Sequence, residues 1–550
     1  MWPTLRDFLQ VPAELTGKGV RIAVVDGKFP NHPDISTDSH RTTHIVSVMD
    51  SEPRPEVFHT QPEPWAGSSH ALRAAAGAGG SGAASQGLYT GIAPEADLFL
   101  IAMYFPEHKS NPDKYLPAMK ALEWVRDNWR KYEIRAVMAA RAFRTDAGLL
   151  PWQMEPLRIL CEELASEGVL VISGTGNVPD QTAIISQTAS PSVLSVGGII
   201  IPPSGDPSRS EIYQGCRGTT FEGKWVPEIL APAANIVLPD KTDGEIAHPL
   251  HAKMDNLPSG YARTNGTSFS GPILLGTAAC LWQAHPNWTA SKMKSALIAS
   301  SRQEPQWSDL RAGLVSVRDA LVIKETERTP ESSITPYRNW LSWRSSPLEQ
   351  RLVKLNSTNP EEVKDTILSF LGDAIPLQAI EPIVEHLKHP IADVRTVALC
   401  ALAAEPAQIN TNYILGAFQD SSPNVRMAGV YLLQKCQNLW LDCKTSFCDL
   451  FNDASLDVRY QSLIQAAKMP YPDFTEPIAA GLEEDARMGR VANFGVRRDA
   501  LEAITGQRFP LDSPPEPGKI PHSNSVRNAR MDLARRWEDW LSSDWKAESG

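Results

Sequence analysis

Ser268 lies in the stretch TNGTSFSGP, residues 264–272, which runs into the apolar segment ILLGTAACLWQA. This pattern predicts a hydroxyl at the head of a long buried helix. A serine can act as a nucleophile there only if a base, a group that orients the base and a donor for the developing oxyanion lie nearby. The alternative is that Ser268 only caps the helix. The rest of the sequence must therefore supply three further groups.

A Gly-Thr-Ser-x-x-x-Pro motif surrounds this serine, and its members are Gly266, Thr267, Ser268 and Pro272. The spacing excludes the G-x-S-x-G motif, because Ser270 stands where the last glycine belongs. It also excludes templates with a proline three residues after the serine. The motif resembles that of subtilisin-like serine proteases (subtilases), and the similarity continues through NGTSFSGPILLGTAACLWQAHPNWT. This resemblance implies a triad in the chain order Asp, His, Ser.

Asp26 follows an aliphatic run in GVRIAVVDGKFPNHPDI, where the resemblance places the triad aspartate. A carboxylate at the carboxyl end of a strand in a parallel sheet lies where such folds form their sites. The family usually has serine or threonine and then glycine after this aspartate, whereas Gly27 and Lys28 follow here. We expect Asp26 to orient and stabilise the base, and the alternative is an aspartate that caps a loop.

His70, in SSHALRAAAGAGG, is the expected general base. The family motif H-G-T-H-V-A-G is degraded here, because Ala71 and Leu72 replace its glycine and threonine, but the small-residue helix face is kept. The following segment LYTGIAPEADLFLIAMY resembles the next family strand and fixes this register. We interpret the competing histidines as surface or core residues; they are His40, His44 and His59.

Asn177 ends the segment GVLVISGTGN, which resembles the subtilase strand that ends in Ala-Gly-Asn. The resemblance implies that its side-chain amide donates to the oxyanion, with the backbone N–H of Ser268 as the second donor. The alternative is a plain turn residue. The implied reaction is peptide hydrolysis through an acyl-enzyme, in which His70 accepts the serine proton and then gives it to the leaving amine.

Substrate-binding residues are less clear in the sequence. VMAARAFRTD stands where subtilases carry a Ser-x-Gly edge for an extended peptide, with Ala140, Arg141 and Ala142 in its place. We expect narrow or acidic-residue specificity, with Arg141 and Arg144 as candidate determinants; the alternative is that both are solvated surface arginines. The loop AGAGGSGAASQG, where the family binds calcium, has no carboxylate. We therefore predict no calcium there, no other metal and no cofactor.

Short aliphatic runs alternate with helical segments up to about residue 325. The expected strands are GVRIAVVDG, ADLFLIAMY, IRAVMAARAF, GVLVISGTGN and SVLSVGGIII, and two expected helices are LPAMKALEWVRDNWRKY and EPLRILCEELASEG. Continuous apolar strands separated by helices predict an α/β fold with a parallel sheet covered on both faces. We predict a subtilisin-like protease domain over residues 1–325 and a polar, proline-containing linker over 326–345.

Helical signals dominate residues 346–550, and a Val-Arg pair recurs there about every 31 to 38 residues. The pairs begin at Val394, Val425, Val458 and Val496. This period predicts an all-α solenoid that resembles HEAT repeats. We expect the repeated arginines to bond within or between repeats rather than to bind a ligand. The closing NARMDLARRWEDWLSSDW predicts a terminal cap helix with aromatic anchors.

Composition limits the classes of partner and compartment. The 550 residues are 42% hydrophobic and carry a net charge of -11, which is typical of soluble globular protein and argues against nucleic acid as the main partner. No apolar run approaches about 18 residues and no secretory signal begins the chain, so we expect no membrane and a cytoplasmic location. We interpret the seven dispersed cysteines as buried free thiols, since even Cys436, Cys443 and Cys448 lack the spacing of a zinc knuckle.

These observations predict an intracellular serine endopeptidase that is regulated or targeted by its helical repeats, on which a substrate or regulatory protein docks. No inhibitory propeptide is visible before the first strand, so we expect the activity to be narrow or gated. The architecture is similar to effector proteases of bacterial defence systems. The alternative function is a catalytically impaired subtilase-fold scaffold that binds protein partners through its repeats.

Overall fold

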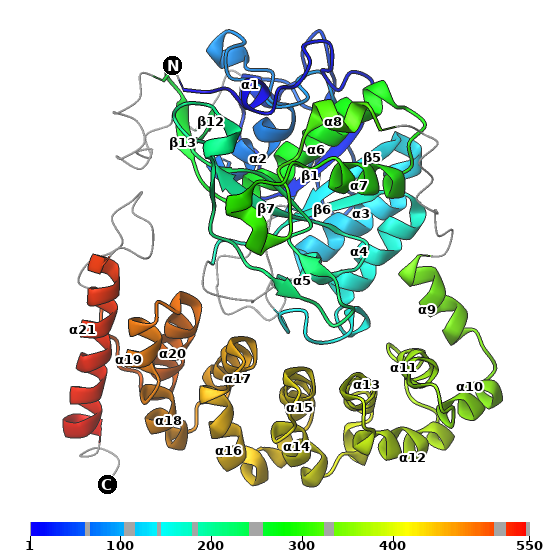
Figure 1. Cartoon of the computed structure of the whole chain (residues 1–550), viewed down its shortest axis with the longest axis vertical. Helices are drawn as coiled ribbons and strands as arrows, with labels where there is room; N and C mark the ends of the chain where they lie inside the picture. The colour runs from blue at the N-terminus through cyan, green and yellow to red at the C-terminus, as the bar shows by residue number, and fades with distance from the viewer. Residues whose placement is uncertain are drawn as a thin grey trace.

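The computed structural model of the 550-residue chain shows an α/β part followed by a wholly helical part (Figure 1). The described residues are 2–60, 67–103, 116–139, 145–178, 185–240, 257–323, 335–510 and 524–545. The predicted fold class, an α/β fold with a mostly parallel sheet followed by an all-helical region, is confirmed.

A mostly parallel sheet forms the centre of the α/β part, in the order β11-β7-β6-β5-β1-β4-β2-β3. The strands are β1 (Arg21–Asp26), β2 (Thr43–Ser47), β3 (Glu56–Val57), β4 (Asp97–Ala102), β5 (Ile134–Ala139), β6 (Leu170–Gly174), β7 (Leu194–Ile200) and β11 (Ile229–Ala234). Only the outer strands β3 and β8 (Glu211–Ile212) pair antiparallel with this sheet within the described ranges. The five aliphatic runs each contain a strand, whereas β2 was not expected from the sequence.

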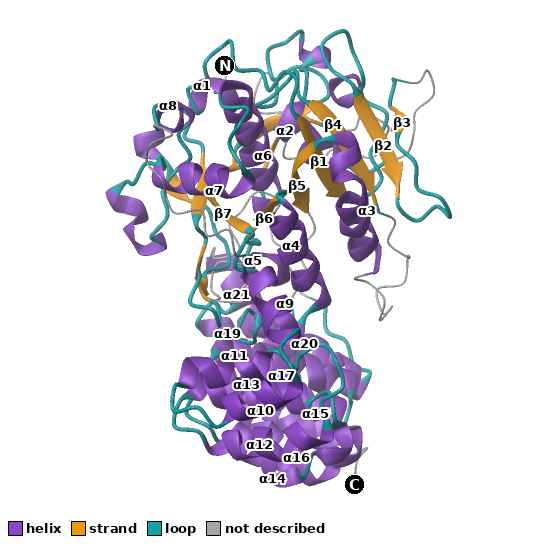
Figure 2. Cartoon of the chain, turned by 90° about the vertical axis from the view of Figure 1, so that its right-hand side faces the viewer, coloured by secondary structure: helices purple, strands orange, loops and turns teal. Residues whose placement is uncertain are grey.

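Helices cover both faces of the sheet, as Figure 2 shows. Alternate residues of β1 point to opposite sides: Ile22 and Val24 pack with α2 (Ser69–Gly79) and α6 (Thr267–Ala284), while Ala23 and Val25 pack with α3 (Leu116–Tyr132) and α4 (Pro156–Glu167). Almost every residue of α6 is buried, because this helix is apolar all round. The apolar run after Ser268 therefore forms the central helix that the sequence predicts.

The remaining elements of the α/β part lie at its edges. They are α1 (Leu5–Phe8), α5 (Ser186–Ala189), α7 (Ala290–Ala299), α8 (Val317–Leu321), β9 (Gly218–Thr219), β10 (Trp225–Val226), β12 (Ile236–Pro239) and β13 (Tyr261–Thr264). The β12–β13 hairpin is joined to α2 by an ion pair of 2.7 Å between Arg73 and Asp240. No helix of the described ranges is both long and apolar enough to cross a membrane.

The helical part forms an arc whose concave side faces the α/β part (Figure 1). Its helices are α9 (Pro336–Arg344), α10 (Leu348–Leu355), α11 (Pro360–Leu368), α12 (Leu377–Glu385), α13 (Ala392–Leu402), α14 (Thr411–Phe418), α15 (Pro423–Lys435), α16 (Trp440–Asp449), α17 (Leu456–Lys468), α18 (Thr475–Ala479), α19 (Leu482–Arg487), α20 (Val491–Thr505) and α21 (Asn524–Trp540). The Val-Arg pairs lie on α13, α15, α17 and α20, which line the inner side of the arc.

Part of the segment predicted as a linker is helical. Helix α9 occupies the second half of residues 326–345, because the side chain of Thr335 caps it and Pro336 fits its first turn. The residues 326–334 lie outside the described ranges.

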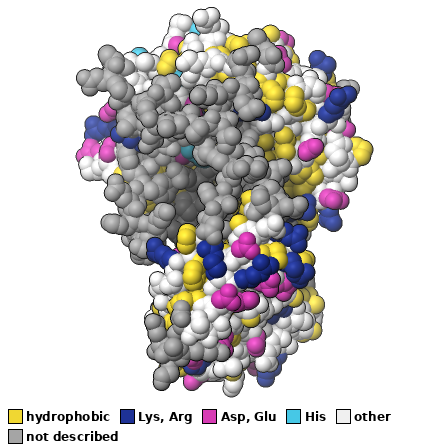
Figure 3. Space-filling model, turned by 90° about the vertical axis from the view of Figure 1, so that its left-hand side faces the viewer, with side chains coloured by type: hydrophobic (Ala, Val, Ile, Leu, Met, Phe, Trp, Pro, Cys, Tyr) yellow, Lys and Arg dark blue, Asp and Glu magenta, His cyan; other side chains and the backbone are white. Residues whose placement is uncertain are grey.

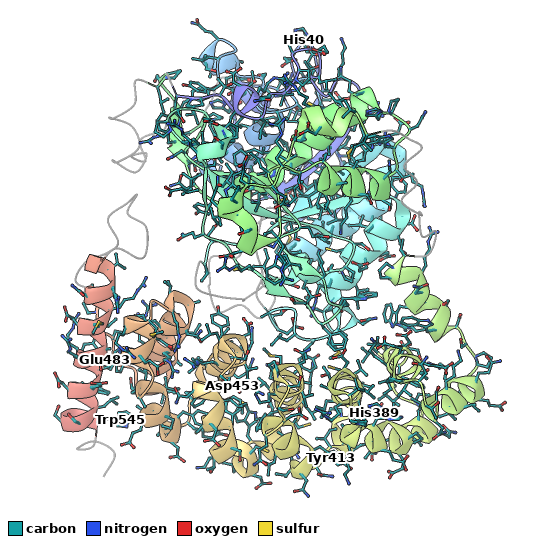
Figure 4. All side chains as sticks on the ribbon, in the orientation of Figure 1. His40, His389, Tyr413, Asp453, Glu483 and Trp545 are labelled. Carbon is teal, nitrogen blue, oxygen red and sulfur yellow. The ribbon has the colours of Figure 1, made fainter. Side chains whose placement is uncertain are left out.

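Bidentate ion pairs join neighbouring repeats. The guanidinium of Arg395 donates to both oxygens of Asp420 at 2.7 and 2.8 Å, and Arg426 donates to both oxygens of Asp453 at 2.7 Å (Figure 4 labels Asp453). A planar guanidinium matches two carboxylate oxygens, so each pair fixes both distance and orientation. The prediction that the repeated arginines are structural is confirmed for these two pairs.

The last two Val-Arg pairs share one carboxylate. Asp485 accepts from Arg459 at 2.9 Å and from Arg497 at 2.6 Å, and Arg497 and Asp485 are both fully buried. The arc then ends in α21, whose Trp537 is fully buried against the rings of Phe509 and Trp540. The predicted aromatic cap helix is thus confirmed.

The cysteines form no disulfide. All seven are free, and six of them are buried, with Cys448 half-buried. Burial raises the pKa of Cys443 and of Cys448 to about 11, so both thiols stay protonated at neutral pH. The interpretation as free thiols is confirmed.

The α/β part rests directly on the concave side of the arc. Leu150 is buried in the same apolar cluster as the repeat helices, and the ring of Trp152 packs edge-on against Trp340 of α9 at 5.3 Å. Arg338 of α9 also donates to the carbonyl of Ser166 at 2.8 Å. Part of the concave surface is therefore covered by the protein's own α/β part.

We predict that Arg426→Gln lowers the free energy of unfolding of the helical part by about 2 kcal/mol, because Asp453 loses a charge-assisted bidentate partner in a nearly buried place. Urea unfolding followed by circular dichroism of the helices measures this change. The matched control is Arg498→Gln, whose pair with Asp499 is more exposed to solvent and is expected to cost less than about 1 kcal/mol. Equal losses in the two variants would contradict the structural role of the inter-repeat pairs.

Candidate functional site

Asp26 and His70 meet at the carboxyl end of β1. Nδ1 of His70 lies 2.7 Å from Oδ2 of Asp26, and the aspartate is fully buried. Ser68 caps α2 by accepting the N–H of His70 at 3.2 Å, so the ring is held on the first turn of that helix. The two residues are 44 positions apart in the chain and are brought together by the packing of α2 on β1.

The aspartate decides which nitrogen of the histidine is available. A carboxylate facing Nδ1 stabilises the tautomer that carries its proton there, which leaves Nε2 as the free base. The other oxygen of Asp26 accepts the N–H of Gly27 at 2.6 Å, so the buried charge has polar partners on both oxygens. The His70 side chain remains 34% exposed and can be reached by a substrate.

Ser268 is the second residue of α6. Gly266, the residue before the helix, has a φ of 148°, which only glycine adopts without strain, and this lets the chain turn from β13 into α6. The helix head lies directly on the end of β6, because a Cβ at Gly174 would overlap the carbonyl oxygen of Thr267. The serine is therefore carried on a rigid, buried helix that begins next to the sheet.

The side chain of Asn177 is held in one orientation by the residue before Ser268. Its Oδ1 accepts the backbone N–H of Thr267 at 2.9 Å and the Thr267 hydroxyl at 3.1 Å. The hydroxyl oxygen of Thr267 in turn accepts the N–H of Gly176 at 2.9 Å. Since the amide oxygen is engaged, the Nδ2 group of this exposed asparagine is free to donate to a ligand.

A second donor lies at the same place. The backbone N–H of Ser268 forms no hydrogen bond with any described residue, as is usual for the first turn of a helix. Together with Nδ2 of Asn177 it provides two donors at the positive end of the α6 dipole. This pair can stabilise a negatively charged oxygen.

Phe269 places the first turn of α6 against the histidine. Its ring centroid lies 5.4 Å from that of His70. No direct hydrogen bond joins Ser268 and His70, both of which are described residues. Nucleophile and base are often further apart in the free protein than in the complex with substrate. The structure therefore joins His70 to Asp26 directly, Asn177 to Thr267 directly, and the His70 ring to that of Phe269, so that each contact involves Asp26 or a neighbour of Ser268.

The competing histidines have other surroundings. His44 lies on β2 and stacks on the ring of Phe99 at 4.8 Å, and burial lowers its pKa. His40 (labelled in Figure 4) is exposed, with its Nδ1 3.4 Å from Glu95, and His59 is exposed. The buried carboxylate of Asp26 instead faces the ring of His70.

The expected substrate-binding segment and the glycine-rich loop differ in whether the structure describes them. The segment Ala140, Arg141, Ala142 and Arg144 lies outside the described residues. The glycine-rich loop after α2 is described, and there Oδ1 of Asp34 accepts the N–H of Ala84 at 2.8 Å. Within the described ranges no three His, Cys, Asp or Glu side chains group as metal ligands would, and the absence of calcium and cofactor stays a prediction.

Sequence reasoning did not find the role of Thr267. The residue belongs to the Gly-Thr-Ser motif, but only the fold shows that its N–H and hydroxyl both meet Asn177. The position of Thr267 next to Ser268 was the one feature of the sequence that could have indicated this role. The spacing of residues does not show which group a hydroxyl contacts.

Comparisons with known proteins extend this description. The model of the subtilase family (peptidase S8) matches residues 17–314. The chain is 29% identical to serine protease AprX of Bacillus subtilis (strain 168), over 52% of this chain and 61% of that protein, and 22% identical to subtilisin E of the same strain, over 56% of this chain and 66% of that protein. The solved structure of the prenylagaramide maturation protease PagA covers 58% of this chain and 97% of its own, with 22% identity and a TM-score of 0.40. The chain thus spans less than two thirds of the length of AprX and of subtilisin E.

We expect a fluorophosphonate probe to label Ser268 and the labelling rate to fall about 10³-fold or more in Asp26→Asn, because the wrong tautomer then faces the serine. The labelling rate of the His70→Ala variant should fall by at least the same factor. Mass spectrometry of the labelled peptide measures both effects, and His40→Ala is the matched control that should label like the unmodified chain. Labelling that survives in His70→Ala but is lost in His44→Ala would show that the base is a different histidine.

Proposed function

Because the chain belongs to the subtilase family, we propose that it is a serine endopeptidase that hydrolyses peptide bonds in a protein or peptide substrate. The observation that carries this proposal is the 2.7 Å contact between Nδ1 of His70 and Asp26, on a ring that lies 5.4 Å from that of Phe269, the residue after Ser268. Asp26, His70 and Ser268 are then the catalytic triad, and Asn177 is the oxyanion donor.

Acylation begins at the hydroxyl of Ser268. Nε2 of His70 accepts the Oγ proton while Oγ attacks the carbonyl carbon of the scissile bond, and Asp26 stabilises the imidazolium that forms. The histidine then gives this proton to the leaving amine, and an acyl-serine remains. A water then gives a proton to the same nitrogen and attacks the acyl carbon; the bond to Oγ breaks, Oγ takes that proton from His70, and the acid is released.

The oxyanion receives two hydrogen bonds. Nδ2 of Asn177 and the N–H of Ser268 are fixed before the substrate binds, since the amide oxygen of Asn177 is held by Thr267. Donors that need no reorganisation stabilise the transition state more than the ground state. Thr267 is thus a positioning residue for the donor.

The competing function, a catalytically impaired scaffold, is favoured by one observation. No direct hydrogen bond joins Ser268 to His70, and both are described residues. The Asp26–His70 contact and the engaged Oδ1 of Asn177 favour the enzyme, because neither arrangement is needed for binding a partner through the repeats.

We predict that Asn177→Asp and Asn177→Ala lower kcat by about 10²–10³ with little change in KM, which is the loss that removal of one oxyanion donor causes in subtilisin. The Asn177→Asp variant keeps an acceptor for Thr267 but has no N–H to donate and adds a negative charge beside the oxyanion, so its loss should be at least as large as that of Asn177→Ala. Hydrolysis of a fluorogenic peptide library measures the effect. Ser268→Ala should abolish turnover, Asn128→Ala on α3 should not change it, and turnover that persists in Ser268→Ala would overturn the proposal.

The proposed organisation is a protease domain over residues 1–325, a connection over 326–345 and HEAT-like repeats over 346–550. The inter-repeat pairs of Arg395 and Arg426 support a stacked solenoid. We propose that the repeats dock a substrate or regulatory protein, and that the protein acts inside the cell. A role as an effector in bacterial defence is proposed by analogy with the architecture of such proteases.

A docking protein would need a part of the arc that does not contact the α/β part. The inner side near α11 and α13 is covered by the segment around Leu150, whereas the end of the arc near α19 to α21 lies away from this contact (Figure 1). Figure 3 shows basic and acidic side chains mixed along the edge of the helical part that faces the α/β part. A surface of mixed charge suits a protein partner better than nucleic acid, which needs a basic one.

We expect a chain truncated after Ser345 to keep its hydrolysis of short peptides and to cleave a larger set of proteins in a cell lysate. The reason is that α9, which packs on Trp152, is kept while the proposed docking repeats are removed. Identification of new N-termini by mass spectrometry counts the cleaved proteins, and fluorophosphonate labelling of Ser268 checks that the truncated site is intact. An unchanged set of cleaved proteins, with labelling intact, would exclude the repeats as the selecting element.

A further inference from the structure

A cavity of about 460 Å³ lies at the junction between the α/β part and the first repeats. One wall comes from the segments around Trp152 and Phe221, and the other from α9, α11 and α13. The volume is in the range of small-molecule sites, and such sites occur preferentially where domains meet. This junction cavity is separate from the residues proposed for catalysis, none of which lines it.

Hydrogen-bond acceptors dominate the polar groups of the junction cavity. Carboxylates of Glu222, Asp365 and Asp393 line it, against a single ammonium among the described lining residues, that of Lys364. The lysine is engaged, because it forms an ion pair with Glu361. Burial raises the pKa of Glu222 to about 7, although Arg158 opposes this rise, so the negative charge of the lining comes mainly from Asp365 and Asp393.

Two of these carboxylates have no partner of their own. Asp365 and Asp393 accept no side-chain hydrogen bond and join no ion pair within the described residues. Burial raises the pKa of Asp365 to about 6, although Lys364 opposes this rise. At neutral pH the group is mostly charged, and a cation placed beside it would be favoured.

Gln153 supplies an independent sign of a missing donor. The residue lines the cavity, is only 5% exposed, and its Oε1 is buried without a hydrogen-bond partner in the described chain. A buried acceptor without a donor costs free energy, so a ligand that donates a hydrogen bond to this oxygen would be favoured. The amide oxygen and the carboxylates all require an N–H donor.

The apolar walls fit a flat cation. Trp152, Phe221 and Trp343 place three aromatic side chains around the same space. Aromatic faces attract cations, and a guanidinium stacks on them while its five N–H groups remain free to reach acceptors on two walls. A point-like ammonium satisfies fewer acceptors at once.

We propose that the junction cavity binds a ligand that carries a guanidinium group on an aliphatic stem, the chemistry of an arginine side chain. The cation would lie between Glu222 on the α/β side and Asp365 and Asp393 on the helical side. It would thereby offset the repulsion of like charges across the junction and hold the two parts together. The site is independent of the proposed peptidase activity.

The wall on the α/β side is already rigid, which favours binding. Trp152 donates its backbone N–H to Glu222 at 2.8 Å, and Phe221 donates its backbone N–H to the carbonyl of Gly148 at 2.7 Å. Behind them the fully buried Arg158 forms an ion pair with Asp146. A wall that needs no ordering loses less entropy when the ligand binds.

The test is calorimetric titration of the full chain carrying Ser268→Ala, so that no ligand is hydrolysed. N-acetyl-arginine amide is compared with N-acetyl-citrulline amide, which has the same shape without the charge. We expect the arginine compound to bind at least about tenfold more tightly than the citrulline compound, because only the charged group forms charge-assisted hydrogen bonds in this half-buried site. The double change Asp365→Asn with Asp393→Asn should remove this preference.

The matched control is Asp442→Asn, an exposed carboxylate on α16 outside the cavity, which should leave the preference intact. Gln153→Met should weaken the binding of the arginine compound several-fold. Equal binding of the two compounds, or a preference that survives the double change, would overturn the proposal. A pentapeptide with a central arginine, titrated in parallel, distinguishes the sources: binding of the peptide points to a protein segment, and binding of the free compound alone points to a small guanidinium metabolite.

Discussion

The direct contact between the head of α6 and the end of β6 is the constraint on which the site depends. Gly174 has no side chain, so the carbonyl of Thr267 can lie against the strand, and Thr267 can then hold the amide oxygen of Asn177. A larger residue at position 174 would move the helix that carries Ser268. Asn177 and Ser268 are therefore positioned by one close approach of backbone to backbone, rather than by the loops around them.

Burial of charge follows one rule in both parts of the chain. The fully buried Asp26 has polar partners on both oxygens, and Asp485 in the repeats has two arginines. An unpaired buried charge would cost several kcal/mol, so pairing is what makes these positions possible. In the junction cavity, by contrast, the buried Oε1 of Gln153 has no hydrogen-bond partner in the described chain, and the half-buried Asp365 joins no ion pair there.

Part of the concave face of the repeats packs against the α/β part of the same chain. Leu150 enters the apolar cluster of the repeats, and Trp152 packs on Trp340, close to the segment where the α/β part continues from β5. The wall of the junction cavity and the start of α4 therefore belong to one short stretch of chain.

The local elements and the motif can be predicted from the amino-acid sequence. Apolar runs marked the positions of β1, β4, β5, β6 and β7, and the Gly-Thr-Ser spacing marked Ser268, because short-range periodicity and turn chemistry are written in neighbouring residues. The folded chain was needed to show the contact between His70 and Asp26, to show what Thr267 holds, and to show that β2 with its His44 joins the sheet. It also decided that α9 is a helix packed on Trp152 and that a cavity forms between the two parts. These features join residues far apart in the chain, and their contacts arise from the packing of whole elements, which no local pattern specifies.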